Sequence, residues 1–154
     1  MLKPFFCALI CLIFAGLPAR AGAGDDILGL WVTAEDKARV EIFKRNDKYY
    51  GKILSLKEPN WPADDDKGMA GQPKNDRNNP DPRLRNRKIL GLGIMNEFVY
   101  SGKNRWVGGT IYDPESGRTY KGKMTLAATN RLEMRGFVGI SLLGRTTVWT
   151  RAER

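Results

Sequence analysis

Apolar and polar residues alternate along much of the chain after residue 28, which is the pattern of half-buried β-strands. The clearest alternation covers residues 119–126, and a second covers residues 131–138. A short turn, Ala128-Thr129-Asn130, separates the two. Two alternating runs joined in this way predict a β-hairpin with one face turned inward.

Shorter runs predict further strands, and no segment has a convincing helical period. We expect them at residues 29–33, 39–42, 48–56, 88–95, 97–100, 105–112 and 146–151. About eight or nine antiparallel strands without an internal repeat predict an all-β protein. Its simplest form is a single up-and-down antiparallel β-barrel, because closure removes the exposed sheet edges.

A barrel of this size is either filled by its own side chains or holds one small ligand. Alternation in the late hairpin assigns to the interior Tyr120, Met124, Leu126, Leu132, Met134 and Val138. These residues suit a ligand-lined cavity and a dry core equally well. Strand glycines such as Gly122 and Gly136 indicate either barrel bends or a close approach of backbone or ligand.

Residues 58–87 interrupt the strand pattern as a long, proline-rich loop. A loop of this length in a compact domain is usually functional or disordered. We expect residues 61–74 to be mobile. Residues 75–87 are expected to be ordered, because the Asn79-Pro80 and Asp81-Pro82 steps restrict the backbone.

The first residues predict a secretory signal peptide, residues 1–21, followed by one domain, residues 22–154. Lys3 precedes an apolar run over residues 5–17, and Ala19-Arg20-Ala21 fits a signal peptidase site. Cleavage after Ala23 fits the same rule. We therefore expect a periplasmic or secreted protein with no integral membrane segment in its mature chain.

Composition excludes most catalytic and metal chemistry. The chain has no histidine, and both of its cysteines, Cys7 and Cys11, lie in the predicted leader. The usual zinc, haem and copper ligands and the His-based nucleophile systems are therefore missing. We predict no catalytic residue, no metal and no cofactor, and the acidic run at 64–66 lacks the spacing of a calcium loop.

The chain is strongly basic, with 26 Lys and Arg against 17 Asp and Glu and a net charge of +9. Such a charge favours anionic partners, among them an anionic envelope surface. Export makes nucleic acid an unexpected partner.

One cluster of residues could form a ligand site at a barrel mouth. Its candidates are Asp81, Arg85, Arg87, Tyr112 and Asp113. Arginine suits bidentate pairing either with a neighbouring carboxylate or with an anionic ligand, so a structural ion-pair knot and a ligand clamp both remain open. Tyr112 and Asp113 equally suit a tyrosine corner and a turn cap.

The two ends of the predicted barrel carry a second cluster, which we interpret as a structural clasp. The first strand holds Gly29 and Trp31, and the last holds Trp149 and Arg151. An antiparallel barrel brings these strands together, so the Arg151 guanidinium can cover the Trp31 ring by a cation–π contact. The clasp identifies a closed end and leaves the ligand open.

These segments together resemble the domain of unknown function 2147 family. The matching stretches are Gly29-Leu30-Trp31, residues 79–87, residues 106–114, residues 117–120 and residues 135–151. The resemblance implies a small exported bacterial protein with a lipocalin-like (calycin) barrel, and it brings no established activity, cofactor or ligand. By likeness to lipocalins, Trp31 and Arg151 would plug the closed end, and a ligand would enter at the opposite mouth.

The leading hypothesis is an exported, non-enzymatic carrier of a small amphipathic or lipid-like molecule. The alternative is an envelope interaction or structural protein that acts through its basic surface and the 58–87 loop. An enzyme built on Tyr112, Asp113 or Asp81 is the least favoured hypothesis.

Overall fold

A computed structural model describes residues 22 and 24–153 of the chain. The predicted signal peptide lies outside the described residues. Within the described part, no helix has the length and apolar character needed to cross a membrane.

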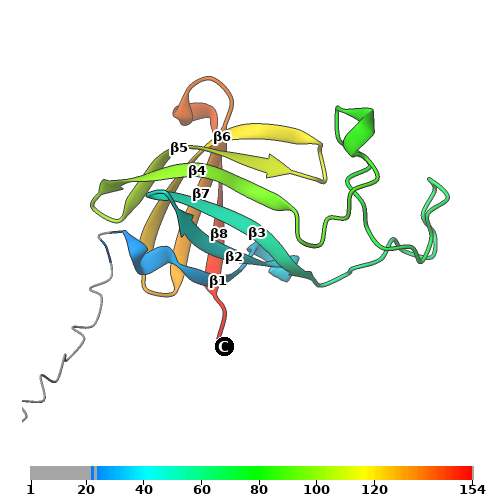
Figure 1. Cartoon of the computed structure of the whole chain (residues 1–154), viewed down its shortest axis with the longest axis horizontal. Coiled ribbons are helices and arrows are strands. Elements are labelled where there is room, and N and C mark those ends of the chain that lie inside the picture. Colours follow the sequence, from blue (N-terminus) through cyan, green and yellow to red (C-terminus); the bar gives the residue numbers. More distant parts are fainter. Residues whose placement is uncertain (1–21, 23, 154) are drawn as a thin grey trace, which may run out of the picture.

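Eight antiparallel strands form a closed barrel in which each strand pairs with its neighbours in sequence and β8 returns to β1 (Figure 1). This confirms the predicted all-β, up-and-down barrel. The strands are β1 (Gly29–Val32), β2 (Ala38–Arg45), β3 (Lys48–Leu56), β4 (Gly93–Gly102), β5 (Arg105–Asp113), β6 (Arg118–Ala128), β7 (Arg131–Phe137) and β8 (Arg145–Arg151). Four 3₁₀ turns accompany them: η1 (Asp25–Ile27), η2 (Ala34–Asp36), η3 (Pro82–Leu84) and η4 (Ser141–Leu143).

The two strands predicted at residues 88–95 and 97–100 are one strand, β4, which begins later. Glu97 has a φ of 59°, and the β3–β4 register shifts between the Tyr49–Phe98 and Gly51–Met95 pairs. A bulge therefore interrupts the alternation without ending the strand.

Up-and-down connectivity gives the barrel two distinct ends. The clasp end carries η1, the C-terminal end of β8, and the β2–β3, β4–β5 and β6–β7 turns. The loop end carries the β1–β2 turn, the β3–β4 segment (residues 57–92), the β5–β6 turn and the β7–β8 loop (residues 138–144). The β3–β4 segment and the β7–β8 loop project from different parts of the barrel (Figure 1).

At the clasp end, the Arg151 guanidinium lies 4.3 Å from the centre of the Trp31 ring. Trp31 is fully buried, and its Nε1 donates a hydrogen bond of 2.8 Å to the Ile27 carbonyl in η1. Arg151 donates from Nη1 to the Leu28 carbonyl (3.1 Å) and from Nε to the Thr129 carbonyl (2.7 Å). The predicted contact is thus present, and it joins η1, β8 and the β6–β7 turn.

The other two predicted clasp residues lie beside this contact. Trp149 is buried two positions before Arg151, on the same face of β8. Gly29 has a φ of +112°, and a Cβ added there would lie 3.7 Å from Arg151 Nη1. The backbone conformation, more than lack of space, therefore requires glycine at this position.

Large side chains fill the clasp half of the barrel. Trp106, Tyr49 and Phe98 are all fully buried, and the Tyr49 and Trp106 rings meet edge to face at 6.1 Å between centres. Two glycines make room for Phe98, because a Cβ at Gly109 or Gly122 would come within 2.4 or 2.5 Å of its ring. These glycines mark a close approach by a core side chain.

Of the six residues predicted to face the interior, four are buried in this core: Met124, Leu126, Leu132 and Met134. Tyr120 is half-buried. The prediction for Val138 was wrong, because this side chain is 73% exposed. The apolar alternation continues past Phe137, but β7 ends there, and Gly139 (φ 72°) turns the chain away from the barrel.

Replacing Arg151 with alanine should lower the free energy of unfolding by about 2–4 kcal/mol, because the variant loses the cation–π contact and leaves the Leu28 and Thr129 carbonyls without their donor. Arg151→Lys keeps the charge but not the fork of donors, and should recover only part of this loss. Urea denaturation measures both. An alanine variant as stable as the native chain would disprove the clasp.

The two interior glycines of the hairpin should respond differently to alanine. A Cβ at Gly122 would lie 2.5 Å from Phe98, whereas a Cβ at Gly136 would meet Tyr120 at an ordinary 3.5 Å. Gly122→Ala should therefore cost about 1–3 kcal/mol by overpacking. Gly136→Ala should be neutral or stabilising by up to about 1 kcal/mol. Thermal melting of the two variants side by side tests this, and equal losses would contradict it.

Candidate functional site

The first part of the β3–β4 segment is a hydrogen-bonded hairpin. Asn60 and Pro73 pair in antiparallel fashion, and Trp61 exchanges backbone hydrogen bonds with Gln72 and Gly71. The Arg77 guanidinium lies 3.3 Å from the centre of the Trp61 ring. The sequence predicts mobility over residues 61–74, but the structure instead shows a hairpin anchored by an aromatic ring.

Arg77 also holds the acidic part of this hairpin. Its Nη1 lies 2.7 Å from Oδ1 of Asp65, whose side chain is only 2% exposed. Burial alone would raise the pKa of Asp65, but hydrogen bonds from Arg77 and from backbone amides hold that pKa below its usual value. Asp65 is therefore a structural anion, consistent with the absence of a calcium-loop pattern in the sequence.

The second part of the segment folds back onto the barrel. Asn75 pairs with Lys88, and the Asp76 amide donates to the Arg87 carbonyl at 2.9 Å. Ile89 and Leu92 are buried in the core cluster. This part is ordered, as its proline steps predict.

A fully buried carboxylate, Asp76, is at the centre of this fold-back. Its Oδ2 accepts hydrogen bonds from Arg87 Nε (2.7 Å) and Asn79 Nδ2 (2.8 Å), and its Oδ1 accepts one from the Tyr112 hydroxyl (2.5 Å). Asn79 Nδ2 also lies 3.0 Å from that hydroxyl. We call Asp76, Asn79, Arg87 and Tyr112 the Asp76 cluster.

The cluster lies between the β3–β4 segment and the outer face of β5. Ile111 on β5 faces the interior, because a Cβ at Gly122 would lie 3.0 Å from Ile111 Cδ1. Side chains alternate along a strand, so the next residue, Tyr112, faces outward. Tyr112 is nevertheless buried, because residues 75–92 cover it. Burial and the hydrogen bond to Asp76 raise the pKa of Tyr112.

The five predicted mouth residues do not form one site. Arg87 and Tyr112 meet in the Asp76 cluster, and Arg85 Nε donates to the Asn79 carbonyl at 2.8 Å. Asp81 caps η3 through the Arg83 amide and pairs with the exposed Arg83 side chain at 2.8 Å. Asp113 caps the β5–β6 turn by accepting from the Glu115 amide and the Ser116 hydroxyl. Asp113 thus serves as a turn cap. For the arginines and carboxylates of residues 76–87, a structural ion-pair knot fits the contacts better than a ligand clamp.

Sequence reasoning missed Asp76 and did not single out the side chain of Asn79. Both are polar residues in a polar stretch, so neither hydrophobic pattern nor charge marks them as buried. Only the pairing of Asn75 with Lys88 brings Asp76 beside Arg87, eleven residues later. In the described part of the chain, no group of His, Cys, Asp and Glu side chains is arranged to hold a metal ion.

Burial of the inward-facing residues of β6, β7 and β8 falls from the clasp end to the loop end. Met124, Leu132 and Trp149 are buried at the clasp end of β6, β7 and β8. The residues on the same faces nearer the loop end are only half-buried: Tyr120, Gly136 and Thr147. Ile111, which pairs with Tyr120, is also half-buried. We use the name cup for this set of four half-buried inward-facing residues.

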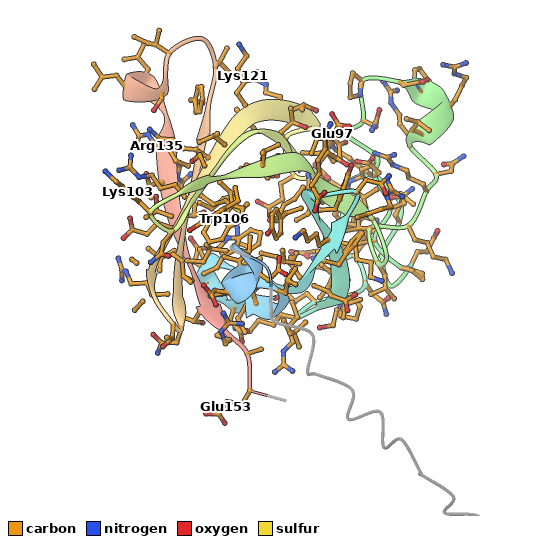
Figure 2. The ribbon with its side chains drawn as sticks, turned by 60° about the vertical axis from the view of Figure 1, so that its left-hand side comes forward. Glu97, Lys103, Trp106, Lys121, Arg135 and Glu153 are labelled. Carbon is orange, nitrogen blue, oxygen red and sulfur yellow. The ribbon has the colours of Figure 1, made fainter. Side chains whose placement is uncertain are left out.

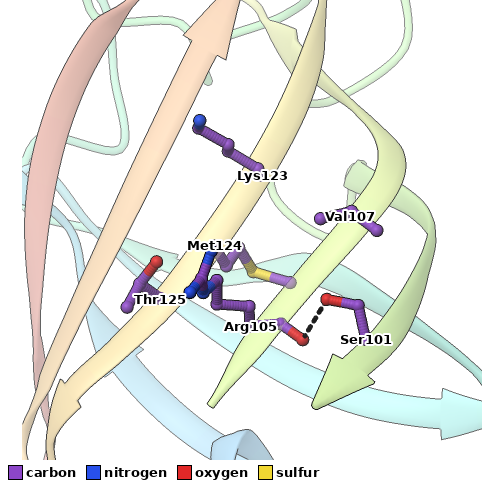
Figure 3. Close-up of a pocket in the computed structure, with 6 residues that line it drawn as sticks. All are labelled: Ser101, Arg105, Val107, Lys123, Met124 and Thr125. Carbon is purple, nitrogen blue, oxygen red and sulfur yellow. Dashed lines mark hydrogen bonds between the residues drawn. The ribbon is translucent and has the colours of Figure 1, made fainter. Parts of the chain in front are cut away.

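A separate groove of about 490 Å³ lies on the outside of the barrel (Figure 3). It follows the β5–β6 register shift between Trp106 and Gly109. The Ser101 hydroxyl donates to the Arg105 carbonyl at 3.3 Å along one side. Its lining residues are Ser101, Arg105, Val107, Lys123, Met124 and Thr125. All of them except Met124 point outward, so this groove is separate from the cup.

Comparison with known proteins agrees with this architecture. A family model described as "Uncharacterized protein conserved in bacteria (DUF2147)" matches residues 29–151. The chain belongs to this family. The DUF2147 match runs from the glycine of the clasp on β1 to its arginine on β8, so it covers the whole barrel. A search of curated proteins found no match.

The DUF2147 chain is also similar to a solved structure, that of protein HP1028 from the human pathogen Helicobacter pylori, which is described as belonging to the lipocalin family. The two sequences are 27% identical, the similarity covers 82% of each chain, and the TM-score is 0.67. The barrel is therefore lipocalin-like.

Removing the Tyr112 hydroxyl tests the Asp76 cluster. Tyr112→Phe should lower the free energy of unfolding by about 1–2 kcal/mol, since Asp76 loses one of its donors. The pKa of Tyr112 is raised in the folded chain, so its stabilisation is complete below the ordinary tyrosine pKa of about 10 and is lost as pH rises through the folded pKa.

The difference in stability between the native chain and Tyr112→Phe should therefore shrink at high pH. Tyr49, whose pKa burial and the Asp25 hydrogen bond also raise, contributes equally to both chains and cancels. Urea denaturation from pH 7 to pH 11 measures this difference. A difference that stays constant would show that Tyr112 has no special linkage to Asp76.

Proposed function

We propose that this DUF2147 protein is an exported, periplasmic or secreted carrier that binds a small amphipathic molecule in the cup. The observation that carries the proposal is the change in burial along the inner faces of β6, β7 and β8. Residues there are buried at the clasp end, whereas Tyr120, Gly136 and Thr147 are half-buried. The lipocalin-like fold supports the proposal, because eight-stranded barrels of this kind can hold one small ligand.

The filled clasp half limits the depth of the cup. Below Tyr120 and Gly136, the interior is occupied by Phe98, Met124 and Met134. A ligand would therefore rest its apolar part on this floor and keep another part near the rim. This arrangement favours a short or partly inserted apolar group over a long chain buried along the barrel axis.

Charge at the rim of the cup suggests the chemistry of the part of the ligand that stays near the rim. Arg118 continues the inner face of β6 two residues before Tyr120, and Arg145 pairs with Gly136 across β7 and β8. Both arginines are exposed, and within the described residues neither forms an ion pair. The proposed ligand is accordingly an amphipathic molecule with an anionic or strongly polar head.

The alternative of an interaction protein that acts through residues 58–87 is less well supported. Asp65, Asp76 and Arg87 in that segment bind other groups of the same chain. The polar atoms of these three residues therefore serve the fold, whereas Asp64, Asp66 and Lys67 are exposed.

Filling the cup is the direct test of the carrier proposal. The anionic, apolar fluorophore 1-anilinonaphthalene-8-sulfonate should bind the native chain, and Gly136→Leu should reduce its affinity roughly tenfold or more by occupying the space beside Tyr120. Gly136→Ala is the matched control, because its Cβ fits at 3.5 Å and leaves most of the cup open. Melting temperatures confirm that both variants fold.

Two further measurements complete the test. Replacing Arg118 and Arg145 with glutamine should weaken the fluorophore severalfold if the rim cations contact its sulfonate. Native mass spectrometry of the exported protein shows whether a molecule copurifies. Equal affinity of the Gly136→Leu and Gly136→Ala variants, together with a protein that is always empty, would refute the carrier.

A further inference from the structure

The β7–β8 loop presents the most exposed apolar residues in the described part of the chain. Val138 is 73% exposed, Ile140 61%, Leu142 81% and Leu143 79%. Other exposed large apolar side chains are less exposed, such as Leu90 at 53% and the cross-strand pair Val99 at 44% and Val107 at 39%. We call residues 138–143 the apolar tip. Four such residues within six positions concentrate exposed apolar surface in one loop, which is typical of a docking surface.

The apolar tip is held in place by the barrel. Arg135 on β7 donates from Nε to the Ser141 carbonyl (2.8 Å), from Nη2 to the Leu142 carbonyl (3.0 Å) and from Nη1 to the Thr146 hydroxyl (2.8 Å). The η4 turn adds a backbone bond from Gly144 to Ser141. Arg135 binds the backbone of the tip and leaves the side chains of Leu142 and Leu143 exposed. Figure 2 shows the η4 turn above Arg135.

Close packing at the base of the β7–β8 loop also holds the apolar tip in place. A Cβ at Gly144 would come within 2.6 Å of the Gly136 carbonyl and 2.8 Å of Phe137 Cβ. The loop therefore returns tightly against β7 and does not spread over the barrel to bury its leucines. Little conformational entropy remains to be lost when the tip docks.

Basic residues lie at the base of the apolar tip. Lys121 pairs with Phe137 at its base, and Lys123 pairs with Arg135 one step below. Arg145, two residues after the tip, is the first residue of β8. The sequence has no Asp or Glu from residue 116 to 132 or from 134 to 152. Among the described residues, Lys121, Lys123 and Arg145 have no acidic partner, so their charge is available to an external anion.

From this geometry we propose that the apolar tip docks into the surface of an anionic lipid bilayer. Leu142, Leu143 and their neighbours enter the interface between headgroups and acyl chains, while the lysines and arginines at the base contact the anionic headgroups. The apolar tip matches the acyl-chain region of such a surface, and the basic residues at its base match the anionic headgroups. An apolar groove on a protein would not require these basic residues. The inference is independent of whether the cup holds a ligand.

The test uses residues 22–154, which include every described residue, and lipid vesicles of two compositions. The protein should cosediment with vesicles containing phosphatidylglycerol and only weakly with vesicles of phosphatidylcholine. Leu142→Ser/Leu143→Ser should reduce binding at least tenfold, because about 80% of each side chain is exposed and the fold does not depend on it. The matched control is Val99→Thr/Val107→Thr, an exposed apolar pair on the barrel wall, which should bind like the native protein.

Charge and position are tested separately. Lys121→Gln and Arg145→Gln should each weaken binding about fivefold, and added salt should weaken it further. Residues 22–154 contain no cysteine, so an environment-sensitive fluorophore can be attached at Leu142→Cys or, as control, at Val99→Cys. Only the label at position 142 should shift to shorter wavelength when phosphatidylglycerol vesicles are added.

Three outcomes would overturn the proposal. The first is unchanged vesicle binding by Leu142→Ser/Leu143→Ser. The second is equal binding to neutral and anionic vesicles. The third is a concentration-dependent dimer of the native chain that the leucine variant abolishes without any vesicle binding, since the tip would then be an interface between two copies.

Discussion

The seam between β1 and β8 is the contact on which the barrel depends, and a single arginine secures it. These strands share only two paired positions, Trp31 with Arg151 and Val32 with Thr150. Every other neighbouring pair of strands has more paired positions than this. The β3–β4 pairing is also longer, although a bulge interrupts it. Two backbone pairs give little closure, so the side chain of Arg151 supplies the rest by covering Trp31 and donating to carbonyls of η1 and the β6–β7 turn.

Closing the barrel in this way determines where a ligand could lie. The clasp places Trp31 and Trp149 in one half of the interior, and Trp106, Tyr49 and Phe98 fill the space beside them. Packing this dense leaves no place for a ligand near the clasp. On β6, β7 and β8, the opposite half has inner residues that are only half-buried, Gly136 and Thr147 among them. The cup, which we propose as the ligand site, is therefore the less buried counterpart of the filled clasp.

The sequence predicted the barrel well because strand alternation and the clasp residues are local or terminal signals. It could not predict the end of β7, since Val138 continues the alternation and only loss of the strand ladder reveals that it leaves the sheet. It also could not identify Asp76, because burial of a carboxylate depends on donors from three places in the chain. Of the candidate mouth residues, Arg87 and Tyr112 meet at Asp76, whereas Asp81 and Asp113 cap η3 and the β5–β6 turn.

β7 links the two surfaces for which we propose functions. Gly136 lies on the wall of the cup, and the preceding residue, Arg135, faces outward and binds the backbone of the apolar tip. The rim arginine Arg145 lies two residues after the tip and pairs with Gly136. A tip seated in anionic lipid would bring the rim of the cup to the level of the headgroups. An amphipathic molecule could then pass between bilayer and cup with its polar head near Arg145 throughout, and its apolar part would have little contact with water. The closed clasp end, on the opposite side of the barrel, would face away from the membrane.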